Sequence, residues 1–194
     1  MSGELRSSHL GIVGRGMLYI NDGYIGLLFD AALQLSEGRL RVSEVLPESP
    51  AARVGVQVGD ELLAINDHEI EAHTNIDELL GRSVERRVRL RIASAENNGV
   101  VRVLAVRPVD LHSYSKLRYR AWVQSNEAYV HRVSTGRLGY VHIAEMSYEA
   151  YQQFLTDLDT EAYGKEGVVI DVRFNHGGHT ASFLLDVLTR RSMV

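Results

Sequence analysis

The sequence predicts a mixed α+β fold in two blocks, a β-rich block followed by the start of an α/β layer. In the first block, short apolar runs with two-residue alternation, such as residues 39–46, are separated by Gly-, Asn- and Asp-bearing turns. In the second block, helices and strands alternate, and the apolar strand at 167–172 runs into the paired glycines Gly177 and Gly178. Such alternation is typical of a parallel α/β layer.

Composition narrows the class of protein. The 194 residues are 45% apolar and 24% charged, enough for one large or two small globular domains. A formal net charge of −4 argues against a nucleic-acid partner, and the absence of cysteine excludes disulfides and thiolate metal sites. The N-terminus lacks the apolar core of a signal peptide, and no stretch is long enough to span a bilayer. We therefore expect a cytoplasmic protein without a membrane partner.

The first block extends from residue 17 to residue 108 and contains short strands and two short helices. Ser49 can cap the first helix, Pro50 suits its first position, and Gly55 suits a left-handed exit. Asn75 can cap the second helix. The expected strands are 17–20, 24–29, 39–46, 61–65, 87–93 and 100–106, and the expected helices are 49–55 and 75–80.

The second block covers residues 109–194, after a domain boundary that we place near Pro108. The expected order is helix 114–133, strand 137–143, helix 147–158, strand 167–172 and helix 180–189. In the long helix, Leu117, Trp122 and Tyr129 could face a core. The basic residues of this helix, by contrast, are expected to form a solvated face: Lys116, Arg118 and Arg120.

Residues 17–108 resemble a PDZ domain, a small β-sandwich with two helices. The resemblance rests on the run from Leu46 to Asp67, which orders an apolar strand end, a small-residue helix, the Gly59-Asp60 turn and a second strand. It implies that a peptide C-terminus adds as a strand and that loop N–H groups hold its carboxylate. The alternative is a structural module that binds no peptide. The loop residues are Gly26, Leu27, Leu28 and Phe29, and Leu28 stands where a second glycine is common, which argues against tight carboxylate binding.

The turn after the strand at 167–172 could hold an oxyanion. A glycine lets a substrate carbonyl approach the backbone without meeting a Cβ, and the N–H of Gly178, supported by Gly177, could donate to the developing charge. Alternatively, the two glycines serve only the angle between strand and helix.

Two histidine patterns suggest further chemistry. Ser8-His9 pairs a hydroxyl with the usual general base, although such a dipeptide is also ordinary on a surface. His176 and His179 could form a metal pair with Asp171 or His142 as a further ligand. Metalloprotease helices place their histidines four apart with an intervening glutamate, whereas here the separation is three and the spacer is Gly-Gly. We therefore expect neither a metal nor another cofactor.

Taken together, these motifs resemble the peptidase core of the tricorn family of serine peptidases, relatives of the tail-specific (C-terminal processing) peptidases. The matching stretches are residues 3–9, 46–67, 118–123, 139–143 and 169–178. The resemblance implies a ClpP/crotonase-like α/β peptidase domain over 109–194, preceded at 1–16 by a piece of a helical subdomain. It implies that His9 is the catalytic base, Ser8 an auxiliary serine and Gly178 the oxyanion-hole glycine. At His176 the family more often has glycine.

The same resemblance implies a cytosolic serine peptidase that hydrolyses oligopeptides and forms a homo-oligomer, a hexameric ring in the family. The family's nucleophilic serine lies several tens of residues beyond the glycine, its acidic partner lies further still, and only sixteen residues follow Gly178. Ser182 and Ser192 come too early, so we expect this chain alone to be inactive. One alternative is a PDZ-type peptide-binding scaffold with a non-catalytic appendage. Another is a truncated product that folds poorly.

Overall fold

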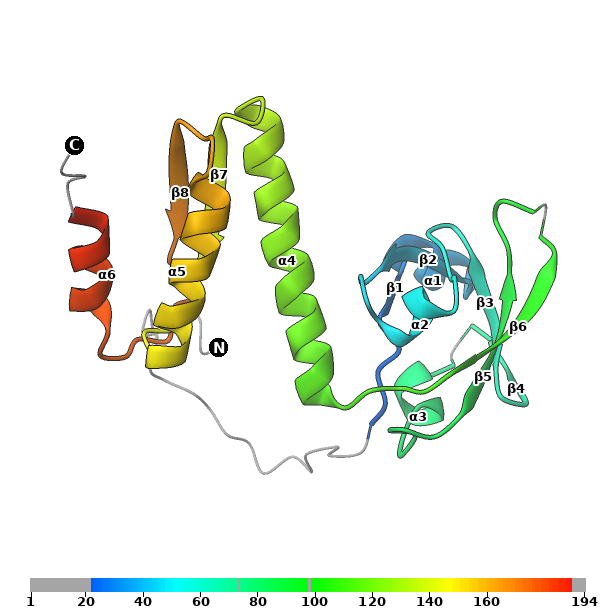
Figure 1. Cartoon of the computed structure of the whole chain (residues 1–194). Coiled ribbons are helices and arrows are strands. Elements are labelled where there is room, and N and C mark those ends of the chain that lie inside the picture. The colour runs from blue at the N-terminus through cyan, green and yellow to red at the C-terminus, as the bar shows by residue number, and fades with distance from the viewer. Residues whose placement is uncertain (1–21, 73, 98, 190–194) are drawn as a thin grey trace. The chain divides into compact units, whose positions relative to one another are not determined.

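The computed structural model describes residues 22–72, 74–97 and 99–189 (Figure 1). Backbone contacts divide the described residues into two compact units, which meet between Ala121 and Trp122 inside a long helix. The first unit therefore continues past Pro108 into the first turns of that helix. Within the described ranges, no helix is both long and apolar enough to cross a bilayer.

The first unit is built on an antiparallel sheet with the strand order β1-β2-β3-β5-β6, in which the short β4 pairs with β3 (Figure 1). The register places Leu62 of β3 opposite Leu40 of β2 and Ile92 of β5, so apolar side chains from three strands share one face. The strands are β1 (Leu27–Phe29), β2 (Leu40–Val45), β3 (Glu61–Ile65), β4 (His68–Glu69), β5 (Val88–Ala93) and β6 (Val101–Val106).

The strands expected at 39–46, 61–65, 87–93 and 100–106 are confirmed. The strand expected at 24–29 is shorter, because Gly26 has a left-handed backbone (φ 81°) and only Leu27–Phe29 pair as a strand. Tyr24 instead makes an isolated bridge to Val109. The strand expected at 17–20 lies outside the described residues.

Three short helices complete the first unit: α1 (Ala31–Glu37), α2 (Pro50–Arg53) and α3 (Ile76–Leu79). The predicted caps are confirmed, because the Ser49 side chain accepts the Ala52 N–H and the Asn75 side chain accepts the Asp77 N–H. Helix α1 was not expected from the sequence. Its signals are Asp30, which accepts two N–H groups at the start, and Gly38, which ends it at φ 67°.

The core of the first unit gathers side chains from one face of the sheet and from its helices. Strand β5 shows the alternation clearly, since Val88, Leu90 and Ile92 are buried. The residues between them, Arg89 and Arg91, point outward to exposed acidic partners. The core consists of Ile25, Leu40, Val42, Ala51, Val56, Leu62, Ile65, Leu80, Val88, Leu90, Ile92 and Val106.

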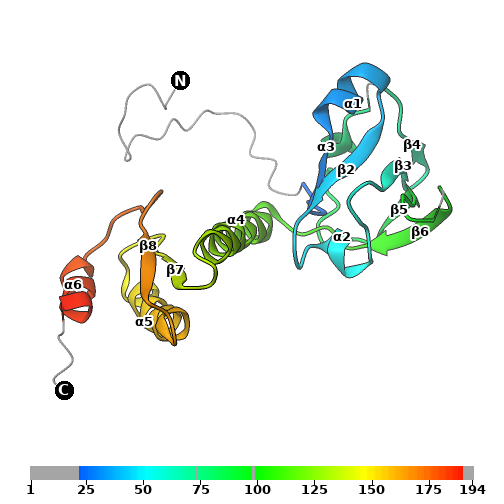
Figure 2. The ribbon, with the colours of Figure 1, turned by 90° about the horizontal axis from the view of Figure 1, so that it is seen from above.

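The second unit contains a parallel strand pair, β7 (Leu138–His142) and β8 (Gly167–Asp171), connected through α5 (Tyr148–Ala162). Tyr140 lies opposite Val169 in this pair. Figure 2 shows α5 beside the two strands, with α6 (Ala181–Thr189) following β8. The small core consists of Val141 and Ile143 from the β7 region, Phe154 of α5 and Leu184 of α6. The predicted βαβ order is therefore confirmed.

The long helix, α4 (Leu111–Val133), begins three residues earlier than expected, because Asp110 accepts the N–H of Ser113. None of its described residues is fully buried. Leu117 and Trp122 are half-buried as expected, but Tyr129 is 57% exposed, so its assignment to a core was wrong. The three basic residues expected on a solvated face are exposed: Lys116, Arg118 and Arg120.

One buried charge organises the turn before β3. Asp60 is completely buried, and its Oδ1 accepts the Ala95 N–H at 3.0 Å. Its Oδ2 accepts the Gln57 N–H at 3.1 Å and an Arg102 Nη2 proton at 2.8 Å. Because its lone pairs are directed at donors from separate segments, this carboxylate connects the turn to β6 and to the end of β5.

Asp60→Asn is expected to destabilise the first unit by about 3 kcal/mol, because the amide leaves the Arg102 guanidinium without its anion and offers a donor where an acceptor is needed. The matched control is Asp67→Asn, since that exposed carboxylate pairs with Arg89 at the surface and should matter by less than about 1 kcal/mol. Hydrogen exchange of the β5 amides under increasing urea measures both. Equal losses in the two variants would contradict this role.

Candidate active site

The candidate site is the turn between β8 and α6. After Asp171 the backbone leaves the strand, and three residues take positive φ angles: Phe174 at 60°, Gly177 at 81° and Gly178 at 143°. The turn is exposed from His176 to His179, and it ends at the buried Thr180, directly before α6. The strand, glycine turn and helix predicted from the sequence are therefore present.

Backbone hydrogen bonds hold this turn against the segment that follows β7. His176 N–H donates to the Ala144 carbonyl at 2.9 Å, and Met146 N–H donates to the Gly177 carbonyl at 2.8 Å. The Met146 carbonyl accepts the N–H groups of His179 at 2.9 Å and Thr180 at 3.2 Å. A parallel bridge between Met146 and Gly178 thus extends the β7–β8 pairing beyond both strands. The shape of the turn is set by main-chain atoms.

The two glycine N–H groups differ in availability. The Gly177 N–H already donates to Asn175 Oδ1 at 2.7 Å, and Asn175 Nδ2 donates to the Ile143 carbonyl at 2.9 Å. The Gly178 N–H, by contrast, meets no acceptor among the described residues. Of the two donors expected from the sequence, only the Gly178 N–H lacks an acceptor in the part of the chain that the structure describes.

Space explains why glycine occupies position 178. A Cβ added to Gly178 would lie 2.3 Å from the Met146 carbonyl oxygen, whereas one added to Gly177 would meet nothing within 4 Å. Gly177 is therefore required only for its left-handed backbone, and Gly178 is required for close packing as well. The close packing at Gly178 is a structural reason for glycine at this position. It is compatible with the alternative in which the glycines serve only the angle between strand and helix.

An ion pair between a buried carboxylate and an exposed guanidinium lies at the start of the turn. Asp171 is only 7% exposed, and its Oδ2 accepts the Tyr140 hydroxyl at 2.6 Å. Arg173 binds both carboxylate oxygens through Nε at 3.0 and 2.9 Å. The Arg173 side chain, followed by the Tyr140 hydroxyl, holds the pKa of Asp171 well below its usual range. Burial, with the adjacent carboxylate, raises the pKa of Tyr140 to about 12.

The Asp171 contacts also bear on the considered metal pair. Because the carboxylate faces Tyr140 and Arg173, it is not directed at His176 or His179. His142 Nε2 lies 2.8 Å from the Arg173 carbonyl oxygen. The structure therefore does not gather the four residues into one ligand set.

Aromatic side chains flank the ion pair. The Trp122 ring lies under the Arg173 guanidinium, with 5.2 Å from Cζ to the ring centroid. The edges of His142 and Phe174 meet the same ring at centroid distances of 4.8 and 5.7 Å. Phe174 is nevertheless 74% exposed. Arg173, Phe174 and Asn175 are site residues to which the sequence analysis gave no role. The only signal was their position between the strand and the glycines.

The other predicted site residues are Ser8, His9 and the expected peptide loop. Ser8 and His9 fall outside the described residues. The expected peptide loop, residues 26–29, consists of Gly26 and the whole of β1, the end strand of its sheet. A Cβ on Gly26 would lie 2.2 Å from Ser49 Cβ, so helix α2 packs closely under the loop. Among the described residues, no acceptor takes the Gly26 N–H.

Comparison with known families agrees with both units. Residues 41–94 match the PDZ domain, and residues 137–188 match peptidase family S41. Tricorn protease homolog 1 of Streptomyces coelicolor is 36% identical to this chain over 97% of the chain and 18% of the relative. The tricorn protease of Thermoplasma volcanium is 29% identical over 97% of the chain and 19% of the relative.

A solved structure gives the same result. The crystal structure of the tricorn protease superposes with a TM-score of 0.75 at 26% identity, over 89% of this chain and 17% of that one. The chain thus spans less than a fifth of the length of these relatives. Its class is defined by a PDZ domain followed by a region that matches peptidase family S41. More narrowly, the chain belongs to the tricorn proteases, as a segment that carries the PDZ domain, and the predicted resemblance is confirmed.

The low pKa of Asp171 predicts an acid-sensitive second unit. Below about pH 4 the unfolded carboxyl binds a proton more readily than the folded one, so the stability that Asp171 contributes is present above that pH and is lost as the pH falls. Asp171→Asn should lower stability at pH 7 and flatten its dependence on acid. Urea unfolding followed by the fluorescence of the single tryptophan, Trp122, reports on this cluster.

Asp159→Asn is the matched control, because Asp159 is an exposed carboxylate on α5. It should retain the wild-type acid dependence. If Asp171→Asn and wild type lost stability in parallel between pH 5 and pH 2, the Asp171 ion pair would not be the source.

Proposed function

We propose that this chain is the PDZ-containing segment of a cytoplasmic tricorn-type serine peptidase that hydrolyses oligopeptides, with Gly178 as oxyanion donor and His9 as general base. The observation that supports the proposal best is the exposed Gly178 N–H, which has no acceptor among the described residues. A rigid, preorganised donor of this kind stabilises charge that develops on a carbonyl oxygen.

The proposed reaction is acyl transfer. A serine hydroxyl attacks the peptide carbonyl while the His9 imidazole takes its proton, and the carbonyl oxygen becomes an oxyanion beside the Gly178 N–H. The imidazole then returns the proton to the leaving amine. Ser8 assists as an auxiliary serine. Gly177 supports the site through its backbone conformation and through the Asn175 bond, which orients the peptide plane before Gly178.

The nucleophile and its acidic partner are proposed to come from parent sequence that these 194 residues do not include. Ser182 lies on α6, within a helix rather than at an exposed strand end. We therefore expect no peptide hydrolysis by residues 1–194 alone, and a homo-oligomeric parent enzyme. The tricorn relatives support this proposal.

In a parent chain that carries the complete peptidase domain, His9→Ala is expected to lower kcat by at least about 10⁴-fold, because the serine loses its general base. Turnover of a fluorogenic peptide measures the effect. His112→Ala, an exposed histidine at the start of α4, is the matched control and should keep wild-type turnover. Normal kcat in His9→Ala would refute the assignment, and so would hydrolysis by residues 1–194 alone.

Gly178 itself cannot be tested cleanly by substitution, since any Cβ would collide with the Met146 carbonyl. The informative change is Asn175→Ala in the parent enzyme. This change removes the acceptor of the Gly177 N–H and the donor to the Ile143 carbonyl. A lower kcat with unchanged KM would show that Asn175 acts by fixing the conformation of the turn.

A second candidate function is peptide binding by the first unit. The observation in its favour is that β1 is an end strand, preceded by a Gly26 N–H that no described acceptor takes. An extended peptide could add beside β1, with its carboxylate at this N–H. In this role the chain would act as a binding module whose peptidase-like part is not catalytic.

The binding function predicts saturable binding of free-carboxylate peptides to the 194-residue chain and loss of binding when the same peptides are amidated. Fluorescence anisotropy of labelled peptide pairs measures the difference. Equal behaviour of the two peptide forms would leave the first unit as a structural module.

A further inference from the structure

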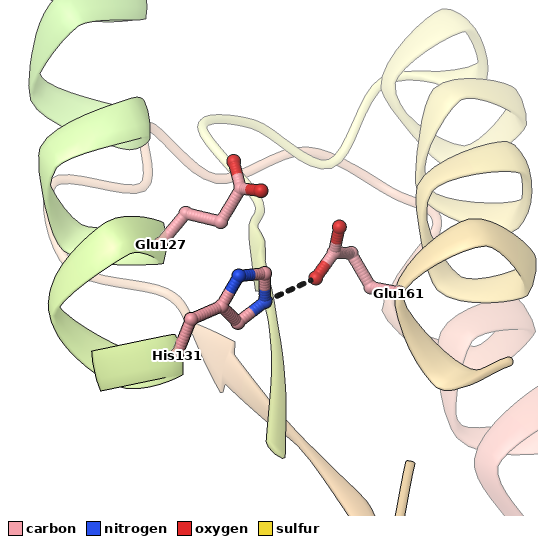
Figure 3. A group of neighbouring side chains, drawn as sticks. All are labelled: Glu127, His131 and Glu161. Atoms are coloured by element: carbon pink, nitrogen blue, oxygen red, sulfur yellow. Dashed lines mark hydrogen bonds and ion pairs between the residues drawn. The ribbon is translucent and has the colours of Figure 1, made fainter. Parts of the chain in front are cut away.

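A group of potential metal ligands lies between α4 and α5 of the second unit. Figure 3 shows Glu127 and His131 projecting from α4 toward Glu161, which projects from α5. One ligand atom from each residue lies within 4.8 Å of the other two. His131 Nε2 and Glu161 Oε2 are 3.1 Å apart.

We propose that Glu127, His131 and Glu161 bind Zn²⁺ or a similar divalent transition-metal ion, which joins α4 to α5. Glu127 and His131 are four residues apart and therefore share one helix face, as chelating pairs on helices do. The site is independent of the proposed peptidase chemistry.

The geometry is close to what zinc needs. With Zn–N and Zn–O bonds of about 2.0–2.1 Å and tetrahedral angles, two ligand atoms lie about 3.3 Å apart. The observed 3.1 Å between His131 Nε2 and Glu161 Oε2 already matches one such edge. The Glu127 carboxylate must move inward, which rotation of its long side chain allows.

The charge around the group favours a cation. The half-buried Glu127 carboxylate has no hydrogen bond or ion pair with any described residue. Lys165 donates to the Gly136 carbonyl and Arg137 pairs with Glu166, so neither of these basic side chains pairs with the group. Two carboxylates thus converge on one imidazole without a further counter-ion from the described part of the chain.

The C-terminal ends of two helices also favour a cation at this group. His131 lies in the last turn of α4, and Glu161 is the next-to-last residue of α5. The C-terminal ends of helices carry partial negative charge and favour cations. Because both ends meet at the triad, the helix dipoles and the two carboxylates act in the same direction.

The backbone of β7 holds Glu161 in place. The Tyr140 N–H donates to Glu161 Oε2 at 3.2 Å, an outer contact of the kind that orients metal ligands. Gly139 permits the approach, because an added Cβ would lie 2.2 Å from the Glu161 carbonyl oxygen. The lone pair of Glu161 Oε2 that faces His131 is the one that would bind the ion.

The ligand types select the ion. One imidazole with two carboxylates suits Zn²⁺, Co²⁺ or Ni²⁺, whereas Mg²⁺ and Ca²⁺ prefer sets made of oxygen alone. Three protein ligands leave a fourth position for water. A bound ion would connect α4, α5 and, through Tyr140, β7.

The test is a calorimetric titration of the 194-residue chain with Zn²⁺ at pH 7.5, repeated with Co²⁺ so that the visible absorption reports the coordination. We expect one saturable site and a higher Tm with zinc. His131→Ala should abolish this site, and Glu127→Gln and Glu161→Gln should each weaken zinc binding by more than about tenfold, since even outer-shell changes cost 10- to 100-fold.

The matched controls are His112→Ala, on the same helix, and Glu166→Gln, an exposed carboxylate paired with Arg137. Both should bind zinc as wild type does, and circular dichroism verifies that every variant is folded. No saturable binding to the wild-type chain would overturn the proposal. Binding that persists in His131→Ala would also overturn it, because the ion would then lie elsewhere.

Discussion

The candidate site depends on a single main-chain carbonyl, that of Met146. It accepts the N–H groups of His179 and Thr180, and it occupies the space that a side chain at position 178 would need. The last two residues before α6 are therefore held by one acceptor on the neighbouring segment. Because buried or crowded main-chain polar groups are costly to leave unpaired, this contact fixes where the Gly178 N–H points.

Side chains add further contacts to this backbone arrangement. Asn175 accepts the Gly177 N–H and donates to the Ile143 carbonyl. The Gly177 N–H is therefore already engaged and does not serve as a donor to a substrate. At the start of the turn, the Asp171 carboxylate forms an ion pair with Arg173 and accepts the Tyr140 hydroxyl. A buried charge with this many partners ties the end of β8 to β7. The turn is thus supported on two sides by groups that have little freedom to move.

Local signals in the sequence were enough for most of the secondary structure. Ser49 and Asn75 were predicted as caps and act as caps, and the alternation over residues 39–46 predicted the half-buried strand β2. These features depend on neighbours within a few residues. Helix α1 was missed because its apolar residues do not reach a core, since none of them is buried, although Asp30 and Gly38 marked both ends.

What the sequence could not show depends on contacts between distant segments. Tyr129 was assigned to a core from helical spacing, yet its side chain is 57% exposed. The sequence predicted the glycine pair as a possible oxyanion turn, but only the structure shows that the Gly177 N–H has an acceptor and that the Gly178 N–H has none among the described residues. In the same way, Glu127 and His131 are ordinary residues of a polar helix until α5 places Glu161 opposite them.

Phe174 has a consequence for how this protein could be engineered. Its left-handed backbone, at φ 60°, costs a residue with a Cβ about 1–2 kcal/mol, and glycine or asparagine would hold the same conformation more easily. The chain instead keeps a mostly exposed aromatic ring against Trp122, four residues ahead of Gly178. Thermostability screens should therefore select against this ring. In a library selected only for heat resistance, Phe174 at the edge of the candidate site would be replaced before the glycines of the turn.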